Sequence, residues 1–258
     1  MTISALIGYT GFVGSNLLNQ NDFDYCYNSK NIADVQNRRF NLVICAAPSA
    51  VKWKANQNPE EDLAHINQLI TSLKKVDTSF FVQISTIDVY PSPVNLDEKS
   101  PIDTTHHHPY GKHRMYLENF VQSHFDKHLI IRLPALFGNG IKKNLIFDLL
   151  HNNALNLTHK DSTFQFYNLA NLWNDINKAR DNKISLLNIT SVPTSSKEIA
   201  NTCFDLEFEN ITANPPVHYD LKSCHAELFG GKNGYIYSKE QVMYDLTHFI
   251  ETERKRND

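Results

Sequence analysis

The feature that most constrains this chain is a glycine-rich loop close to its N-terminus. The segment Gly8–Gly14 has glycine at its first, fourth and seventh positions. It follows the apolar run Thr2–Ile7, which predicts a strand buried on both faces, and it precedes a helix predicted to begin at Ser15–Gln20. Glycine at these positions permits a tight strand-to-helix turn and close approach of a ligand to the backbone.

Such a turn has a chemical use as well as a structural one. Main-chain N–H groups at the start of a helix bind phosphate, and a dinucleotide diphosphate needs close contact with them. We therefore expect the loop Gly8–Gly14 to bind a dinucleotide. The alternative is a tight turn that holds no ligand.

Predicted strands alternate with predicted helices as far as residue 134. The strand-like runs are 24–28, 42–47, 80–84 and 129–133, and the helical segments are 59–75 and 110–125. This alternation is typical of βαβ units, whose right-handed crossovers give a parallel, doubly wound sheet. The sequence predicts an α/β fold with a Rossmann-type dinucleotide-binding domain over residues 1–134.

The alternation of predicted strands and helices is less regular after Pro134. Helices are expected at 143–150, 169–179, 195–204 and 238–254, and a strand at 184–189. Ser195 with Glu198 three residues later forms a capping box, which marks the start of a helix. We expect residues 135–258 to form a small α/β substrate-binding lobe that is interleaved with the first domain.

Charge and composition exclude several classes of protein. The net charge of −3 favours neither nucleic acid nor an anionic membrane as a partner. No apolar run approaches the roughly 20 residues of a membrane-spanning helix, and the first residues lack the features of a signal peptide. The four cysteines are scattered, and Cys45 lies in an apolar run, so we expect reduced thiols and a cytoplasmic protein.

Several motifs follow the glycine loop in a recognisable order. The loop contains Thr-Gly-Phe-Val-Gly, and Leu-Val-Ile-Cys-Ala-Ala, Ser-Thr-Ile-Asp-Val-Tyr and Arg-Leu-Pro-Ala-Leu-Phe-Gly-Asn-Gly come after it. With the strand–helix unit at 187–200, these segments resemble the extended short-chain dehydrogenase/reductase family. That family includes NAD(P)-dependent nucleotide-sugar epimerases, dehydratases and 4-ketoreductases.

The resemblance implies which residues contact a nicotinamide cofactor. Beyond the loop, the family places an Ala-Ala motif on the adenine side and further contacts on the active-site helix and the fifth main strand. The implied cofactor-binding residues are Gly8, Thr10, Gly11, Phe12, Val13, Gly14, Ala46, Ala47, Pro48, Tyr110, Arg114 and Leu133.

The end of the second predicted strand bears on the choice of cofactor. NAD-binding domains usually have Asp or Glu there, to hold the ribose 2′-hydroxyl. This chain has Asn28, Ser29 and Lys30 instead, which could bind a 2′-phosphate. NADP(H) is therefore favoured, while NAD(H) stays possible if these residues only form a solvated turn.

The resemblance also implies two catalytic hydroxyls, those of Thr86 and Tyr110. A tyrosine with an ordinary pKa of about 10 needs a nearby cation to act near neutral pH, and the family supplies a lysine four residues later. This chain has Arg114 there, which could lower the pKa of Tyr110 and bind ribose but could not relay a proton as a neutral amine. Lys112 is expected to point to the other side of the helix.

The activity that we expect is NADPH-dependent reduction of a nucleotide-linked keto-sugar. Two alternatives stay open: an epimerase that retains NAD, and a non-catalytic NADP(H)-binding module. The family suggests a homodimer formed through 59–75 and 110–125. No metal is expected, because His106–His108 cannot all face one ion. His113 is expected to be exposed, and Trp53 either lines the substrate cleft or packs in the core.

Overall fold

The computed structural model describes residues 3–257, so Thr2, where the first predicted strand begins, lies outside the described residues. The chain divides by its internal contacts into two units. The first contains the described residues up to Ser92 together with Pro101–Arg132 and Ala170–Leu187. The second contains Pro93–Ser100, Leu133–Leu169 and the residues from Asn188 onward.

A six-stranded sheet is the centre of the fold. Its strands are β1 (Ser4–Ile7), β2 (Tyr25–Tyr27), β4 (Leu42–Cys45), β6 (Phe81–Thr86), β7 (His128–Leu133) and β11 (Leu186–Asn188), in the order β11-β7-β6-β4-β1-β2. The strands are parallel, with Leu6 opposite Cys26 on one side and Ile44 on the other. The predicted Rossmann-type α/β fold is thereby confirmed.

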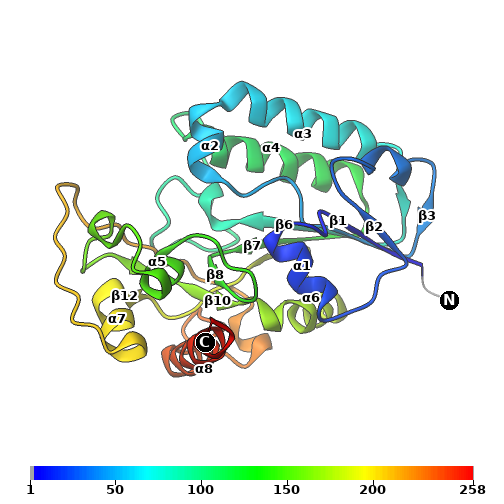
Figure 1. The fold of residues 1–258 in the computed structure, drawn as a ribbon. Coiled ribbons are helices and arrows are strands. Elements are labelled where there is room, and N and C mark those ends of the chain that lie inside the picture. The colour runs from blue at the N-terminus through cyan, green and yellow to red at the C-terminus, as the bar shows by residue number, and fades with distance from the viewer. Residues whose placement is uncertain (1–2, 258) are drawn as a thin grey trace. The chain divides into compact units, whose positions relative to one another are not determined.

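Helices cover both faces of this sheet within the first unit. The helices α3 (Pro59–Leu73) and α4 (Pro109–His124) lie together on one face, and α1 (Phe12–Leu18) and α6 (Leu172–Asp181) lie on the other (Figure 1). The apolar stripes of α3 and α4 pack on the sheet, with Ile66, Leu73 and Val121 inaccessible to solvent. Burial of these stripes is the main reason that the two helices form here.

The strand order reverses between β1 and β4. From β1 the chain continues to its neighbour β2 at the edge, and it then returns to β4 on the opposite side of β1. In open α/β sheets, ligands bind outside the carboxyl ends of the strands at such a switch point. The glycine loop begins at the carboxyl end of β1 and therefore lies at the expected position.

The second unit has short strands and three helices. The strand β8 (Ala135–Phe137) pairs in parallel with β10 (Phe166–Asn168), and β9 (Thr163–Phe164) pairs antiparallel with β12 (Thr194–Ser195). The helices are α5 (Leu145–His151), α7 (Ser196–Phe204) and α8 (Lys239–Asn257). The predicted capping box is confirmed, because the Glu198 amide donates to Ser195 Oγ at 3.1 Å.

Some elements were absent from the sequence-based prediction because they are too short to show a periodic pattern. These are α2 (Lys52–Gln57), the paired strands β3 (Arg39–Phe40) and β5 (Asp77–Thr78), the short strands of the second unit, and the 3-10 turns η1 (Ile32–Val35), η2 (Ile87–Val89), η3 (Leu155–Leu157), η4 (Leu169–Asn171) and η5 (Ala226–Phe229). The first helix begins at Phe12, three residues before its predicted start, and Gly11 occupies its N-cap position. In the part of the chain that the structure describes, no helix is both long and apolar enough to cross a membrane.

Candidate active site

The glycine loop is packed so tightly that side chains are excluded from two of its three glycine positions. Gly8 has φ +84°, and a Cβ there would lie 2.9 Å from the carbonyl carbon of Ala46. A Cβ on Gly14 would lie 2.2 Å from the oxygen of Gly8, which holds the start of α1 against the end of β1. Glycine is required at both positions because the backbone itself occupies the space.

Gly11 differs from the other two glycines. A Cβ there would meet only the oxygen of Gly8, at 3.3 Å, within the described structure. Gly11 and Thr10 are exposed, while Phe12 and Val13 are half-buried in the first turn of α1. The loop therefore keeps an accessible face beside the first amides of the helix, which have no partners within an α-helix. These residues fit the diphosphate of a dinucleotide.

The carboxyl ends of three further parallel strands lie at the same edge of the sheet as this loop. Asn28 follows β2, Ala46 follows β4, and Thr86 ends β6. The chain is fully buried through Cys45 and becomes half-buried at Ala46, Ala47 and Pro48. Cys45 is buried as predicted, and burial raises the pKa of its thiol to about 12.

The end of β2 is held by the amide of Asn28. Its Nδ2 donates to the hydroxyl of Tyr9 at 3.3 Å, and its Oδ1 accepts from the backbone of Lys30 at 2.9 Å. The side chain of Asn28 is thus used to shape the turn. Ser29 and Lys30 are exposed on it, so that the accessible groups of the turn are a hydroxyl and an ammonium.

Thr86 and Tyr110 are brought together. The Thr86 side chain lies close enough to the phenol to favour its ionised form, although the two residues come from the end of β6 and the first turn of α4. The amide of Asp88 donates to Thr86 Oγ1 at 3.1 Å. That bond occupies one of the two acceptor sites of the threonine oxygen and leaves the hydroxyl proton available to a partner.

Tyr110 is 4 % exposed, and this burial controls its ionisation. Burial raises the pKa of the phenol, and the charge of Arg114 opposes the effect without overcoming it. Tyr110 is therefore protonated at neutral pH. Such a group is suited to donate a proton, whereas abstraction of one would require the disfavoured phenolate.

Arg114 stacks on Tyr110 and is held by Asp62. Its guanidinium carbon lies 4.3 Å from the centre of the Tyr110 ring. Its two terminal nitrogens donate to the two carboxylate oxygens of Asp62 at 2.9 and 3.0 Å, and one of them also donates to the carbonyl of Ser49 at 2.6 Å. The cation is thus fixed beside the phenol and partly neutralised by a carboxylate.

Asp62 was missed in the sequence because it lies in the acidic first turn of α3, where carboxylates usually stabilise a helix N-terminus. It also accepts a hydrogen bond from His113 at 2.8 Å. Burial alone would raise the pKa of Asp62, but the bonds from Arg114 and His113 lower it overall. The expectation that His113 is exposed was wrong, because the imidazole turns inward to this carboxylate.

Two residues considered in the sequence, Lys112 and Trp53, are both exposed. Lys112 is exposed, while Tyr110 on the same helix is buried. Trp53 is 64 % exposed and is therefore not packed in the core.

The histidine loop is built into the start of α4. His107 Nε2 is hydrogen-bonded to the carbonyl of Asp88 at 2.7 Å, and His108 Nδ1 accepts from the amide of Gly111 at 3.0 Å as the helix cap. Burial, with the nearby charge of Lys52, lowers the pKa of His108 to about 4. The ring is therefore neutral, as an accepting nitrogen must be. Lys52 pairs with the carboxylate of Asp88 at 2.7 Å.

A buried ion pair lies next to the segment that contains Thr86. Arg132 on β7 donates to Glu118 on α4 through its Nε and one terminal nitrogen, and through the other to the hydroxyl of Tyr90 at 2.7 Å. Ser85, next to Thr86, donates to the same carboxylate. These bonds tie β6, β7 and α4 to one another, which fixes the positions of Thr86 and Tyr110.

Leu133, the last residue of β7, is buried and belongs to the second unit. Its contact with a cofactor stays a prediction.

Solved structures resemble this chain over almost its whole length. A dTDP-4-dehydrorhamnose reductase from Bacillus anthracis str. Ames, in complex with NADP, is 17 % identical with a TM-score of 0.77, and the match covers 98 % of this chain and 100 % of that one. The corresponding enzyme from Clostridium acetobutylicum ATCC 824 is 18 % identical with a TM-score of 0.75, covering 97 % and 99 %. A UDP-N-acetylglucosamine 4-epimerase from Methanobrevibacter ruminantium M1 is 13 % identical with a TM-score of 0.75, covering 99 % of each chain. At these identities the likeness shows the fold alone.

Curated proteins give no match. The model of the NAD dependent epimerase/dehydratase family matches residues 21–181, which is more than half of the chain. The match begins after the glycine loop and includes both Thr86 and Tyr110. The chain therefore belongs to the NAD dependent epimerase/dehydratase family.

Proposed function

We propose that this protein reduces a keto group of a nucleotide-linked sugar with NADPH. The observation that carries the proposal is the proximity of the Thr86 and Tyr110 side chains, with the phenol kept protonated by burial. A protonated tyrosine beside a donor hydroxyl is the arrangement that carbonyl reduction needs, because the product alkoxide must receive a proton.

The cofactor fits the residues at the carboxyl edge of the sheet. The accessible face at Gly11 would receive the diphosphate, and Ala46–Pro48 would lie along the adenine side. Ser29 and Lys30 favour NADP(H), because a 2′-phosphate would find a hydroxyl and a cation there. Two of the similar proteins were crystallised with NADP and NADPH, and another with NAD, which agrees with this preference while leaving NAD(H) possible.

When bound, the reduced nicotinamide supplies the hydride to the carbonyl carbon. Thr86, oriented by the amide of Asp88, donates a hydrogen bond to the carbonyl oxygen. Tyr110 transfers its proton to that oxygen as the C–O double bond becomes single, and the alcohol forms. The resulting phenolate regains a proton from solvent, and the charge of Arg114 stabilises it in the interval.

One observation favours a second function. Asp62 partly neutralises Arg114, so that Tyr110 has a weaker cationic partner than a free lysine would provide. A non-catalytic NADP(H)-binding module would also have these contacts.

The test follows the absorbance of NADPH while the full-length protein is mixed with dTDP-4-dehydrorhamnose and related nucleotide-linked 4-keto-sugars. We expect turnover that falls by about 10²- to 10⁴-fold in Tyr110→Phe, which keeps the ring but removes the acid. The loss of turnover should exceed any loss of NADPH affinity in this variant, because Tyr110 is only one of the implied cofactor contacts.

The outcomes distinguish the candidate functions. NADPH binding without turnover of any keto-sugar would favour the non-catalytic module. Purification of the protein with tightly held NAD, together with interconversion of two sugar epimers, would favour an epimerase.

A further inference from the structure

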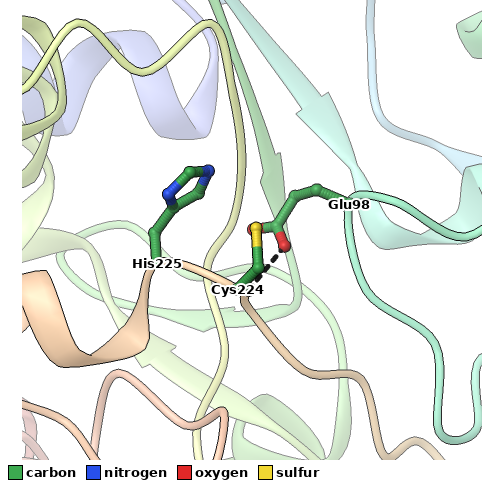
Figure 2. Close-up of side chains that lie close together, drawn as sticks. All are labelled: Glu98, Cys224 and His225. Atoms are coloured by element: carbon green, nitrogen blue, oxygen red, sulfur yellow. Dashed lines mark hydrogen bonds between the residues drawn. The ribbon is translucent and has the colours of Figure 1, made fainter.

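The second unit contains a cluster of three different metal-ligating groups, apart from the residues discussed so far. The side chains of Glu98, Cys224 and His225 offer one ligand atom each, and these three atoms lie within 4.8 Å of one another (Figure 2). Glu98 comes from the segment Pro93–Ser100, whereas Cys224 and His225 directly precede η5. Chain segments more than a hundred residues apart in sequence therefore meet here.

Glu98 is held in place by the backbone around it. Its Oε1 accepts from the amide of Asn188 at 2.8 Å and from the hydroxyl of Ser223 at 2.6 Å. Its Oε2 accepts from the amide of Cys224 at 2.8 Å. Because each carboxylate oxygen has two acceptor sites, Oε2 keeps one for a further partner. Outer contacts of this kind orient a carboxylate that ligates a metal.

The Cys224 thiol and the His225 imidazole are the further groups beside this carboxylate. Cys224 is exposed and His225 is half-buried, so that a small ion can reach both side chains from solvent. Figure 2 shows the sulfur beside the Glu98 oxygen and the imidazole on the adjoining residue. A cation bound between sulfur and oxygen would take the place of the thiol proton, which would be released to solvent.

The chemistry of the three groups selects the ion. Thiolate and imidazole disfavour Mg²⁺ and Ca²⁺, whereas zinc is bound by sulfur, nitrogen and carboxylate oxygen together. Zinc–ligand bonds of about 2.0–2.3 Å place tetrahedral ligand atoms roughly 3.3–3.8 Å apart. The present separation of up to 4.8 Å therefore has to close by about 1 Å. Rotation of the Cys224 and His225 side chains can provide this movement while Glu98 stays fixed.

We propose that Glu98, Cys224 and His225 form a zinc site in the second unit, with a fourth position for water. The ion joins the segment that contains Glu98 to the turn before η5 and stabilises the fold of this unit, because it binds the folded chain more tightly than the unfolded one. This proposal is independent of the proposed redox activity. No local pattern in the sequence marks these three residues as a group, because Glu98 and Cys224 are 126 residues apart.

The test uses full-length protein that has been treated with a chelator and kept reduced, and then titrated with Co²⁺ as a spectroscopic substitute for zinc. We expect a thiolate-to-cobalt charge-transfer band and the intense visible absorption of tetrahedral cobalt, both removed by one equivalent of Zn²⁺. Cys224→Ser should lose the charge-transfer band. Its affinity for zinc, measured against a chromophoric chelator, should fall by more than the 10- to 100-fold that loss of an outer contact typically costs.

Two matched variants exclude other sources of the signal. Cys26→Ser removes a half-buried thiol of the first unit, and His106→Ala removes the exposed member of the histidine loop. Both should keep the wild-type spectrum. Zn²⁺ should raise the unfolding temperature of the wild type and leave that of Glu98→Gln unchanged. A wild-type titration without the charge-transfer band, or equal zinc affinity in wild type and Cys224→Ser, would overturn the proposal.

Discussion

Tyr110 holds its proton more tightly than a free tyrosine, because burial of the phenol outweighs the charge of Arg114. The sign of this shift has a kinetic consequence. The neutral phenol persists beyond the ordinary tyrosine pKa of 10.0. Carbonyl reduction needs the neutral phenol. Ionisation of Tyr110 should therefore leave the reduction rate unaffected near neutral pH and lower it only at strongly alkaline pH. Alcohol oxidation needs the phenolate and should rise with pH.

Removal of the Arg114 charge should move both pH profiles further toward alkaline pH. The variant is Arg114→Gln combined with Asp62→Asn, because the second change avoids an unpaired buried carboxylate. Arg114→Lys, which keeps a cation, is the control and should shift the profiles less. Initial rates in both directions across pH measure the effect. Identical profiles in the double variant and the wild type would show that Arg114 does not act on Tyr110.

Lys30 is predicted to select between the two cofactors. It is exposed on the turn after β2, where a 2′-phosphate would lie. Lys30→Ala should weaken NADPH binding by about tenfold, a loss of about 1.4 kcal/mol, and leave NADH binding unchanged. Lys74→Ala, an exposed lysine at the end of α3, is the control. Equal losses for the two cofactors would contradict the assigned role.

The glycine loop makes a prediction at the level of the βα element. Gly14→Ala would place a Cβ 2.2 Å from the oxygen of Gly8, whereas Gly11→Ala would place one at 3.3 Å. The first variant must separate α1 from β1 and should lose about 1–3 kcal/mol of unfolding free energy. The second should lose less, because the Gly8 oxygen has to shift by only a few tenths of an ångström. Urea denaturation of the two proteins measures the contrast, and equal stabilities would refute the packing described for Gly14.

The ion pair between β7 and α4 makes a second prediction at this scale. The side chains of Glu118 and Arg132 are 0 % and 2 % exposed. Glu118→Gln would leave a buried guanidinium without its counter-charge and should cost about 3–5 kcal/mol of unfolding free energy. Glu61→Gln, in an exposed pair with Lys54, should cost less than about 1 kcal/mol in the same experiment. Similar losses of unfolding free energy in both variants would mean that burial of an ion pair does not determine the cost of breaking it.

Local signals in the sequence were sufficient to predict the main elements. The glycine spacing predicted the first strand-to-helix turn, and apolar runs predicted the main strands of the sheet. The apolar stripe that contains Ile66 and Leu73 predicted α3. The capping pair at Ser195 placed α7. The second unit also contains strands of only two or three residues. Such strands are too short to show an alternation of apolar and polar residues, and only their pairing in the structure reveals them.

Partners that lie far apart in the chain could not be predicted. Thr86 and Tyr110 were expected through resemblance, but nothing in the sequence links Arg114 with Asp62, 52 residues away, or Lys52 with Asp88. Such pairs depend on how the helices pack. For the same reason, the ribose contact of Arg114 and the homodimer through 59–75 and 110–125 stay predictions.

For the molecule as a whole, the proposed function depends on a nicotinamide dinucleotide bound at the carboxyl edge of the sheet. Calorimetric titration of the full-length protein with NADPH tests this most directly. We predict saturable binding of one dinucleotide per chain, weaker binding of NADH, and a large loss of NADPH affinity in Gly11→Ala, whose added methyl group would occupy the accessible face of the loop. Absence of binding heat with both cofactors, or equal NADPH affinity in Gly11→Ala and the wild type, would contradict it.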